Sequence, residues 1–400
     1  MVEVVLWEWL DLAVRWLHVI AGVAWIGSSF YFVHLDLSLK QREGLPEGAA
    51  GEAWQVHGGG FYNMVKYLVA PARMPDRLTW FKWEAYTTWL SGMALLVLVY
   101  YLQAELYMID RGLLDLAPWQ AVALSLAGLA LGWVVYDLLC RSPLGRNDTA
   151  LALVGLVFLT LLAWACWQVF SGRGALMQMG ALIGTIMVAN VAMVIIPGQR
   201  KVVKALIAGE DPDPELGRRG KQRSLHNNYL TLPVIFVMIG NHYPLAFAGR
   251  WSWLILAIVL VIGALIRHFF NQRHKGAASP WWTWGASLAG MAAIVWLSAA
   301  PATEAGGEAK GKEGADTAAV EEILLSRCSM CHAAEPVWEG IALPPKGVAL
   351  ETPEEIRRQA RAIDLQVVRT HAMPPGNVTE ITEAERRILA AWITAGAPGW

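Results

Sequence analysis

The stretch LMQMGALIGTIMVANVAMVII, residues 176–196, contains no charged side chain. A helix needs about 20 mostly apolar residues to cross a bilayer, so this stretch predicts a transmembrane helix. Seven other segments are also mostly apolar, and the sixth is the least typical because Pro233, Asn241, His242 and Pro244 interrupt it. The eight predicted spans are roughly 7–33, 87–107, 117–139, 150–170, 176–196, 231–248, 251–270 and 281–300.

The composition of the whole chain agrees with a membrane protein. Of 400 residues, 56% are hydrophobic and 16% are charged, and the mean hydropathy is +0.39. An ordinary soluble domain has about 25% charged residues. The 21 tryptophans suit membrane interfaces. The net charge of -1, without a basic face, argues against a nucleic-acid partner. The acidic leader (Glu3, Glu8 and Asp11) argues against a cleaved signal peptide.

The basic residues predict the orientation of the chain. Lysines and arginines are frequent in residues 34–86 and 197–230, and in the short loops after the third and seventh spans. The loops after the second, fourth and sixth spans hold one arginine each, namely Arg111, Arg173 and Arg250. Loops rich in Lys and Arg stay in the cytoplasm, so both termini are predicted to lie outside.

A cysteine motif follows the last span. The sequence Cys328-Ser329-Met330-Cys331-His332 is the attachment signature of a c-type haem, in which both thiols bind the porphyrin and the histidine ligates the iron. A disulfide would leave His332 without a role. A zinc site would need a second ligand pair, and the remaining cysteines, Cys140 and Cys166, are far upstream. Because c-type haem is normally attached outside the cytoplasm, the motif predicts the same orientation as the basic loops.

The C-terminal part is expected to be a small helical domain. Residues 301–319 have the composition of a flexible linker, which divides an integral-membrane catalytic domain (1–300) from a cytochrome c domain (320–400). Helices are predicted up to Cys328, over 353–370 and over 382–395, the last with a capping box from Thr382 and Glu385. The expected fold is therefore all-α: a polytopic bundle of about eight spans, both termini outside, and a C-terminal cytochrome c domain.

The second axial ligand of the haem is predicted to be Met373. It lies about 40 residues after the motif in a Pro-rich loop, and a thioether ligand raises the potential of the iron. Two alternatives remain: ligation by His371, or an open position. Within the bundle, His18 and His242 could hold a b-type haem between two helices. The alternative for each histidine is a hydrogen-bonded packing role.

The loops predicted to lie inside hold candidate substrate residues. Glycines at 58–60 permit close approach of a ligand, while Arg, Asn and His can bind a planar polar anion. A hinge with ordinary positive-inside charges is the alternative, and 61–68 could form a helix on the membrane surface. The candidate catalytic residues are His57, Asn63, Arg73, His226 and Asn227.

Several motifs together resemble the bacterial integral-membrane urate oxidases (urate hydroxylases) with a fused cytochrome c domain. The resemblance implies oxidation and hydration of urate to 5-hydroxyisourate, with electrons passing to haem c, and a multi-pass protein of the bacterial inner membrane with a periplasmic tail. It also implies urate, membrane lipid and a downstream electron acceptor, a soluble cytochrome or a terminal oxidase, as partners. The resembling residues are 16–27, 57–62, 71–83, Cys328 to His332, 344–348 and 373–376.

Two other functions fit the same residues. A non-catalytic subunit could relay electrons from quinol or another protein to the tail haem. A haem or copper transport protein could carry a redox tail. Reduction of the tail haem by urate under anaerobic conditions distinguishes the enzyme from both.

Overall fold

The computed structural model describes residues 2–67, 71, 74–299, 317–339 and 341–399. Each of the eight predicted spans coincides with a long helix or a run of joined helical segments. These are α1 (Val2–Ser38), α2 with η1 (Trp83–Leu95, Leu96–Tyr101), α4 (Pro118–Arg141), α5 (Asp148–Val169), α6 with η3 and α7 (Gly172–Ala189, Asn190–Ile195, Ile196–Ile207), α8 (Pro214–Gly240), α10 (Ser252–His274) and α11 (Trp282–Ala299). We call residues 2–299 the helical bundle.

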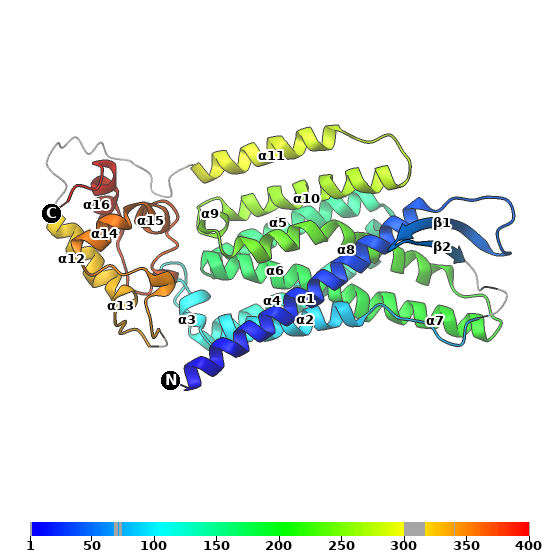
Figure 1. The fold of residues 1–400 in the computed structure, drawn as a ribbon, viewed down its shortest axis with the longest axis horizontal. Coiled ribbons are helices and arrows are strands. Elements are labelled where there is room, and N and C mark those ends of the chain that lie inside the picture. The colour runs from blue at the N-terminus through cyan, green and yellow to red at the C-terminus, as the bar shows by residue number, and fades with distance from the viewer. Residues whose placement is uncertain (1, 68–70, 72–73, 300–316, 340, 400) are drawn as a thin grey trace.

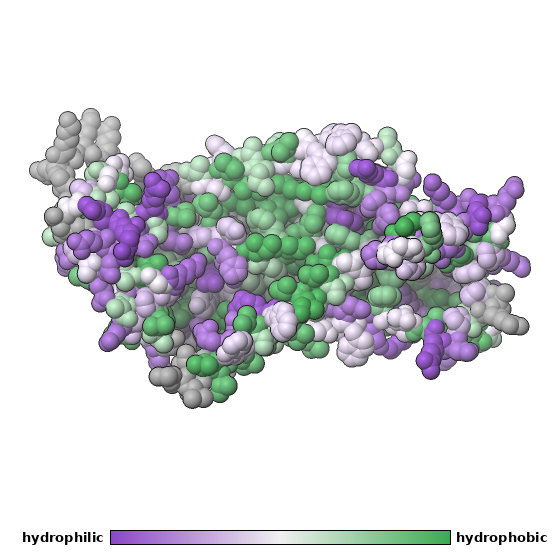
Figure 2. All heavy atoms as spheres, in the orientation of Figure 1, coloured by the Kyte–Doolittle hydropathy of each residue, from purple (hydrophilic) through white to green (hydrophobic). Residues whose placement is uncertain are grey.

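Among the described residues, five helical segments are long and apolar enough to cross a membrane: Val5–Ser38, Pro118–Arg141, Asp148–Val169, Gly172–Ile207 and Ser252–His274. Hydrophobic side chains cover the middle of the bundle, and hydrophilic ones gather toward its two ends (Figure 2). The count of eight crossings stays a prediction.

The sixth predicted span has different bounds in the structure. Helix α8 begins at Pro214, where the Asp213 side chain accepts a hydrogen bond from the Glu215 amide, and it ends at Gly240. The short helix α9 (Pro244–Phe247) follows after a turn. The predicted end at residue 248 was wrong, because the polar pair Asn241-His242 and Pro244 stop the helix.

The bundle also contains a β-hairpin, so the all-α prediction was wrong in this part. Strand β1 (Ala49–His57) pairs antiparallel with β2 (Gly60–Tyr67). Gly58 and Gly59 form the turn with φ of 57° and 80°, the backbone that a tight two-residue hairpin requires. Residues 61–67 are therefore a strand, and neither a hinge nor a surface helix.

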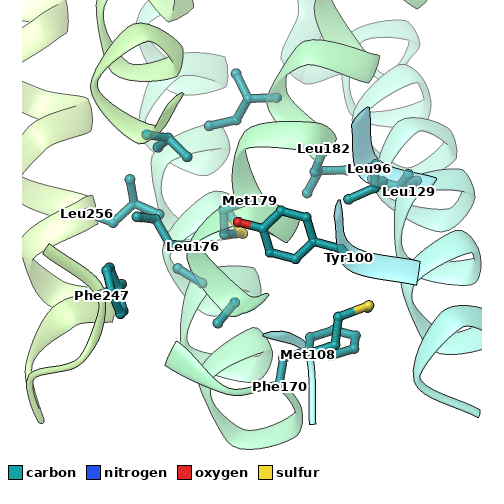
Figure 3. Packing of buried hydrophobic residues seen from close by; sticks show 14 of the residues in the cluster. Leu96, Tyr100, Met108, Leu129, Phe170, Leu176, Met179, Leu182, Phe247 and Leu256 are labelled. Carbon is teal, nitrogen blue, oxygen red and sulfur yellow. The ribbon is translucent and has the colours of Figure 1, made fainter. Parts of the chain in front are cut away.

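Helix α6 lies at the centre of the bundle. In the most apolar window of the segment Gly172–Ile207, which contains α6, 61% of the residues are buried. In the most apolar window of α1, at the periphery, only 6% are buried. Buried side chains from several helices pack around it, and Tyr100 of η1 extends toward Met179 of α6 (Figure 3). A short helix, α3 (Ala104–Tyr107), and a 3-10 turn, η2 (Pro143–Arg146), complete the bundle.

Residues 317–399, which we call the tail domain, have a hydrophobic cluster of their own that includes Val320, Leu324, Leu389 and Trp392. The capping box of α16 is confirmed: the Glu385 amide donates to Thr382 Oγ1, and the Thr382 amide donates to the Glu385 carboxylate. The segments are α12 (Thr317–Arg327), α13 (Ser329–His332), η4 (Pro345–Gly347), α14 (Pro353–Arg358), α15 (Ala360–Ile363), η5 (Asp364–Arg369), η6 (Pro375–Asn377) and α16 (Glu383–Thr394).

The start of α1 and the tail domain lie at one end of the molecule, which we call the tail end (Figure 1). The β-hairpin and α7 lie at the opposite end, the hairpin end. The chain would begin and end at the same side of the bundle if it crossed the membrane an even number of times. The side of the membrane that each end faces stays a prediction.

Candidate functional site

The cysteine motif of the tail domain forms one helical turn. The amides of Cys331 and His332 both donate to the Cys328 carbonyl, at 3.2 and 2.9 Å. Cys328 is buried and Cys331 is half-buried, and neither forms a disulfide. Burial raises the pKa of the Cys328 thiol to about 12 and also raises the pKa of Cys331. Both thiols are thus at least partly shielded from water, Cys328 within the apolar core of the tail domain.

The imidazole of His332 is oriented for ligation. Its Nδ1 lies 2.8 Å from the Val348 carbonyl oxygen, and that acceptor requires the proton to be on Nδ1. The other ring nitrogen, Nε2, is then unprotonated and able to bind a metal. This pairing of one ring nitrogen with a backbone carbonyl is common among metal-binding histidines.

Met373 lies in the same part of the tail domain. It packs against the hydrophobic cluster that contains Cys328. Its amide donates to the Gln366 carbonyl at 2.9 Å, and its carbonyl accepts from the buried Arg386 at 3.1 Å. The structure therefore brings one of the two predicted thiols, Cys328, and the predicted thioether to one core. This set of donors fits a covalently attached haem.

His371, the alternative axial ligand, also remains suitable. Its Nδ1 lies 3.7 Å from the Glu383 carboxylate, and its Nε2 is buried without a hydrogen-bond partner among the described residues. Burial, followed by the charge of Arg386, lowers the pKa of His371. A neutral imidazole with a free nitrogen keeps this alternative open.

The loop that carries Met373 contacts the helical bundle. Ala372 packs against the bundle core. Gly376 has a φ of 54°, and a Cβ at this position would lie 2.1 Å from the carbonyl oxygen of Ile109. The contact with Ile109 leaves no room for a side chain, and the positive φ also favours glycine. The predicted redox site thus lies directly against the tail end of the bundle.

His18, on α1, faces α2. Its Nδ1 lies 2.9 Å from the Thr88 carbonyl oxygen and 3.1 Å from Ser91 Oγ. A Cβ on Gly92 would lie 2.9 Å from His18 Cε1, so the glycine makes room for the ring. A donor at Nδ1 leaves Nε2 able to accept a ligand, although the same bonds also satisfy a packing histidine.

His242 does not lie within a helix. It follows α8 in an exposed turn, which corrects the expectation of two helix-borne histidines at similar depth. Within the described residues, no hydrogen bond or ring contact joins His242 to His18. The preceding Asn241 is buried, and its Oδ1 accepts from Tyr100 at 2.9 Å and from Arg173 at 2.8 Å. The haem b ligation stays a prediction.

Two of the predicted substrate residues lie in a buried polar network between α4, η3 and α8. His226 Nδ1 lies 2.7 Å from Tyr136 Oη. Asn190 donates to Asn227 Oδ1 at 2.9 Å and to Tyr136 Oη at 3.0 Å. We call this the Asn190 network; its members are Tyr136, Asp137, Asn190, Arg223, His226 and Asn227.

The charges of the Asn190 network balance. Arg223 donates to Asp137 Oδ1 at 2.7 Å and to Asn190 Oδ1 at 3.1 Å. The network also contains the start of η3, a π-helical segment, and such segments are frequent at functional sites. The sequence analysis missed Tyr136, Asn190 and Arg223. A polar side chain inside an apolar run was the available signal for Asn190.

The other substrate candidates lie elsewhere. His57 lies exposed at the hairpin turn, and Asn63, on β2, donates to the Glu52 carboxylate at 2.8 Å. Arg73 lies outside the described residues. Among these five candidates, the structure brings together His226 and Asn227, and it places His57 and Asn63 on the hairpin.

Comparison with known proteins gives one result. Searches of curated proteins and of solved structures returned no match. The family model described as urate oxidase N-terminal matches residues 4–298, which cover the helical bundle. Over these residues the chain belongs to the urate oxidase N-terminal family.

Proposed function

We propose that the chain is a membrane-bound urate oxidase that passes electrons from urate to a haem c in its own tail domain. One observation carries the proposal: a urate oxidase family unit and a complete haem c donor set occur on one chain. The contact between the Met373 loop and the bundle supports the transfer of electrons between the two parts.

The reaction releases electrons that need an acceptor. Urate and one water give 5-hydroxyisourate, two protons and two electrons. An iron centre accepts one electron at a time, so a single haem must be oxidised between the two transfers. A second haem held by His18, with or without His242, would allow both electrons to leave the substrate promptly.

The tail residues have separate roles in this proposal. Cys328 and Cys331 would hold the porphyrin through thioether bonds, and His332 and Met373 would ligate its iron. When bound, the haem supplies a one-electron acceptor. Val348 fixes the tautomer of His332, and Arg386 holds the backbone on both sides of the Met373 loop by donating to the carbonyls of Val367 and Met373.

The Asn190 network would take up the protons. The 2.7 Å bond between Tyr136 and His226 gives a proton a direct path between phenol and imidazole. Asn190 holds the Tyr136 hydroxyl by donating to it, and Asn227 in turn accepts from Asn190. His226 is thus the proposed general base, and Tyr136 its partner.

The proposed setting is the bacterial inner membrane, with the tail domain in the periplasm. The hydrophobic middle of the bundle and the five helices long enough to cross a membrane support it. A soluble cytochrome or a terminal oxidase would then reoxidise the tail haem from outside.

The test is an anaerobic titration of the purified full chain with urate. Loss of urate absorbance together with appearance of the reduced haem c α-band is expected, with one urate consumed for every two haems reduced. The variant C328A/C331A should bind no covalent haem and should not reduce an added acceptor at the wild-type rate. Reduction by quinol but not by urate would favour the relay function.

A further inference from the structure

One buried arginine of the bundle lacks an acidic partner. Arg267, on α10, is 5% exposed. Of the three buried arginines in the described part of the chain, Arg223 pairs with Asp137 and Arg386 with Glu383. Arg267 has no carboxylate within ion-pair distance among the described residues.

The contacts of Arg267 are neutral. Nε and Nη2 donate to Asn228 Oδ1 and Asn271 Oδ1, each at 3.3 Å, and the guanidinium lies 3.9 Å from the centre of the Phe30 ring. A cation–π contact offsets only part of the free-energy cost of burying an ion. The positive charge is therefore undercompensated.

A second donor beside Arg267 is unused. Asn228 is fully buried, and its Oδ1 already accepts from Arg267 and, at 3.0 Å, from Asn271 Nδ2. Its own Nδ2 is buried without a hydrogen-bond partner in the described structure. A buried donor that is left unpaired destabilises the fold, because it has lost its hydrogen bonds to water. Among the described residues, the Arg267 guanidinium thus has no carboxylate partner, and the neighbouring Asn228 Nδ2 has no hydrogen-bond acceptor.

A histidine pair lies next along the same two helices. His34 follows Phe30 by one turn on α1, and His274 follows Arg267 by two turns on α10. The two imidazoles meet edge to face, 4.5 Å between ring centres, and His274 Nδ1 is another buried nitrogen without a partner in the described residues. Buried nitrogens without hydrogen-bond partners in the described residues, first Asn228 Nδ2 and then His274 Nδ1, therefore continue toward the hairpin end.

Anchoring of Arg267 at the membrane surface does not explain these contacts. An arginine that reaches for the interface keeps its guanidinium in water, whereas Arg267 is buried. It also lies seven residues before the end of α10, about 10 Å along the axis.

We propose that Arg267 and Asn228 bind the urate anion, a planar ring whose carbonyl oxygens and deprotonated nitrogen accept hydrogen bonds. This rests on the proposed function and assigns its substrate site. Arg267 supplies the counter-charge, Asn228 Nδ2 donates to a carbonyl, and Phe30 supports the guanidinium plane. Asn227 and Asn228 are consecutive on α8, so the Asn190 network lies at the same level of that helix.

The decisive variant is Asn228→Asp. It is isosteric, removes the free donor and gives Arg267 the carboxylate that it lacks. The fold should be kept, while the urate anion is repelled. Equilibrium dialysis of the full chain with radiolabelled urate under anaerobic conditions should show affinity weakened on the order of tenfold or more, as for loss of charge-assisted hydrogen bonds. Arg267→Gln should weaken it similarly.

The matched control is Arg219→Gln, which removes a positive charge from an exposed ion pair on the same helix as Asn228. It should bind urate as the wild type does. Wild-type affinity in both Asn228→Asp and Arg267→Gln, with unaltered urate oxidation, would overturn this site and leave the proposed function standing. A wild-type chain that neither binds nor oxidises urate would instead overturn the proposed function.

A lipid phosphate is the other source of an anion here. Phosphate analysis of the purified variants distinguishes it. If Arg267→Gln loses a stoichiometric phospholipid while urate affinity is unchanged, the anion is a headgroup and the urate assignment is wrong. Unchanged phospholipid content with weakened urate binding supports the assignment.

Discussion

At the scale of single residues, the tail and the bundle use polar groups in opposite ways. His332 has its Nδ1 satisfied by Val348, which leaves one nitrogen able to bind a metal. Asn228 Nδ2 has no acceptor among the described residues, and the neighbouring Arg267 has neutral acceptors but no carboxylate partner there. The first pattern suits a ligand of the predicted haem. The second suits the proposed binding of an anion.

The Met373 thioether sets the redox potential if it is the axial ligand. In Met373→Ala the haem should stay attached through Cys328 and Cys331, but its midpoint potential should fall on the order of 0.1 V, within the ~0.8 V that axial ligands span. A spectroelectrochemical titration measures the shift. His371→Ala is the matched variant, and a fall there with no change in Met373→Ala would transfer the ligand role to His371.

His18 depends on the absence of a side chain at position 92. In Gly92→Ala the new methyl would lie 2.9 Å from His18 Cε1, so the ring must move from its bonds to Thr88 and Ser91. The thermal midpoint should fall, and any b-type spectrum should weaken. Gly155→Ala, on α5, meets nothing within 4 Å and should raise the midpoint, because alanine favours a helix by about 1 kcal/mol over glycine. A similar gain in both variants would contradict the role of Gly92.

At the scale of elements, features set by neighbouring residues could be predicted from the sequence, whereas pairings between distant residues could not. The helices and the capping box at Thr382 follow from apolar runs and from residues three apart, and the structure has them. The hairpin was not predicted because its strands do not alternate cleanly between buried and exposed residues, and the glycines at its turn also fit a ligand-binding loop or a hinge. The Asn190 network was missed because its bonds join residues up to 90 positions apart.

A second capping box makes the tail domain sensitive to acid. Glu355 accepts from the amides of Glu351 and Thr352, each at 3.1 Å, and these bonds lower the pKa of its carboxyl. A lowered folded pKa gives stability that is present above the ordinary value of 4.5 and is lost as the pH falls toward the folded value. Glu355→Gln should flatten this loss. Thermal melts of the tail between pH 6 and pH 3, followed by the haem absorbance, should show it; an unchanged pH dependence would contradict it.

At the scale of the whole molecule, the tail domain is held against the bundle by the loop that carries its predicted axial ligand. Contacts join η6 to α3, and Ala372 reaches the bundle core. The predicted haem ligands and the tail end of the bundle would then be fixed relative to each other. Electron transfer across a fixed contact does not wait for two parts to meet by diffusion.

Two glycines test whether this contact matters. Gly376 and Gly347 both have positive φ, 54° and 66°, so alanine at either costs about 1–3 kcal/mol in backbone strain. Only at position 376 would the methyl meet the Ile109 carbonyl, at 2.1 Å, whereas Gly347 has nothing within 4 Å. Gly376→Ala should therefore separate the loop from α3. Hydrogen exchange of the Ala104–Ile109 amides should quicken in this variant alone, and haem reduction by urate should slow with it. Equal exchange in the two variants would show that the tail is not held at this point.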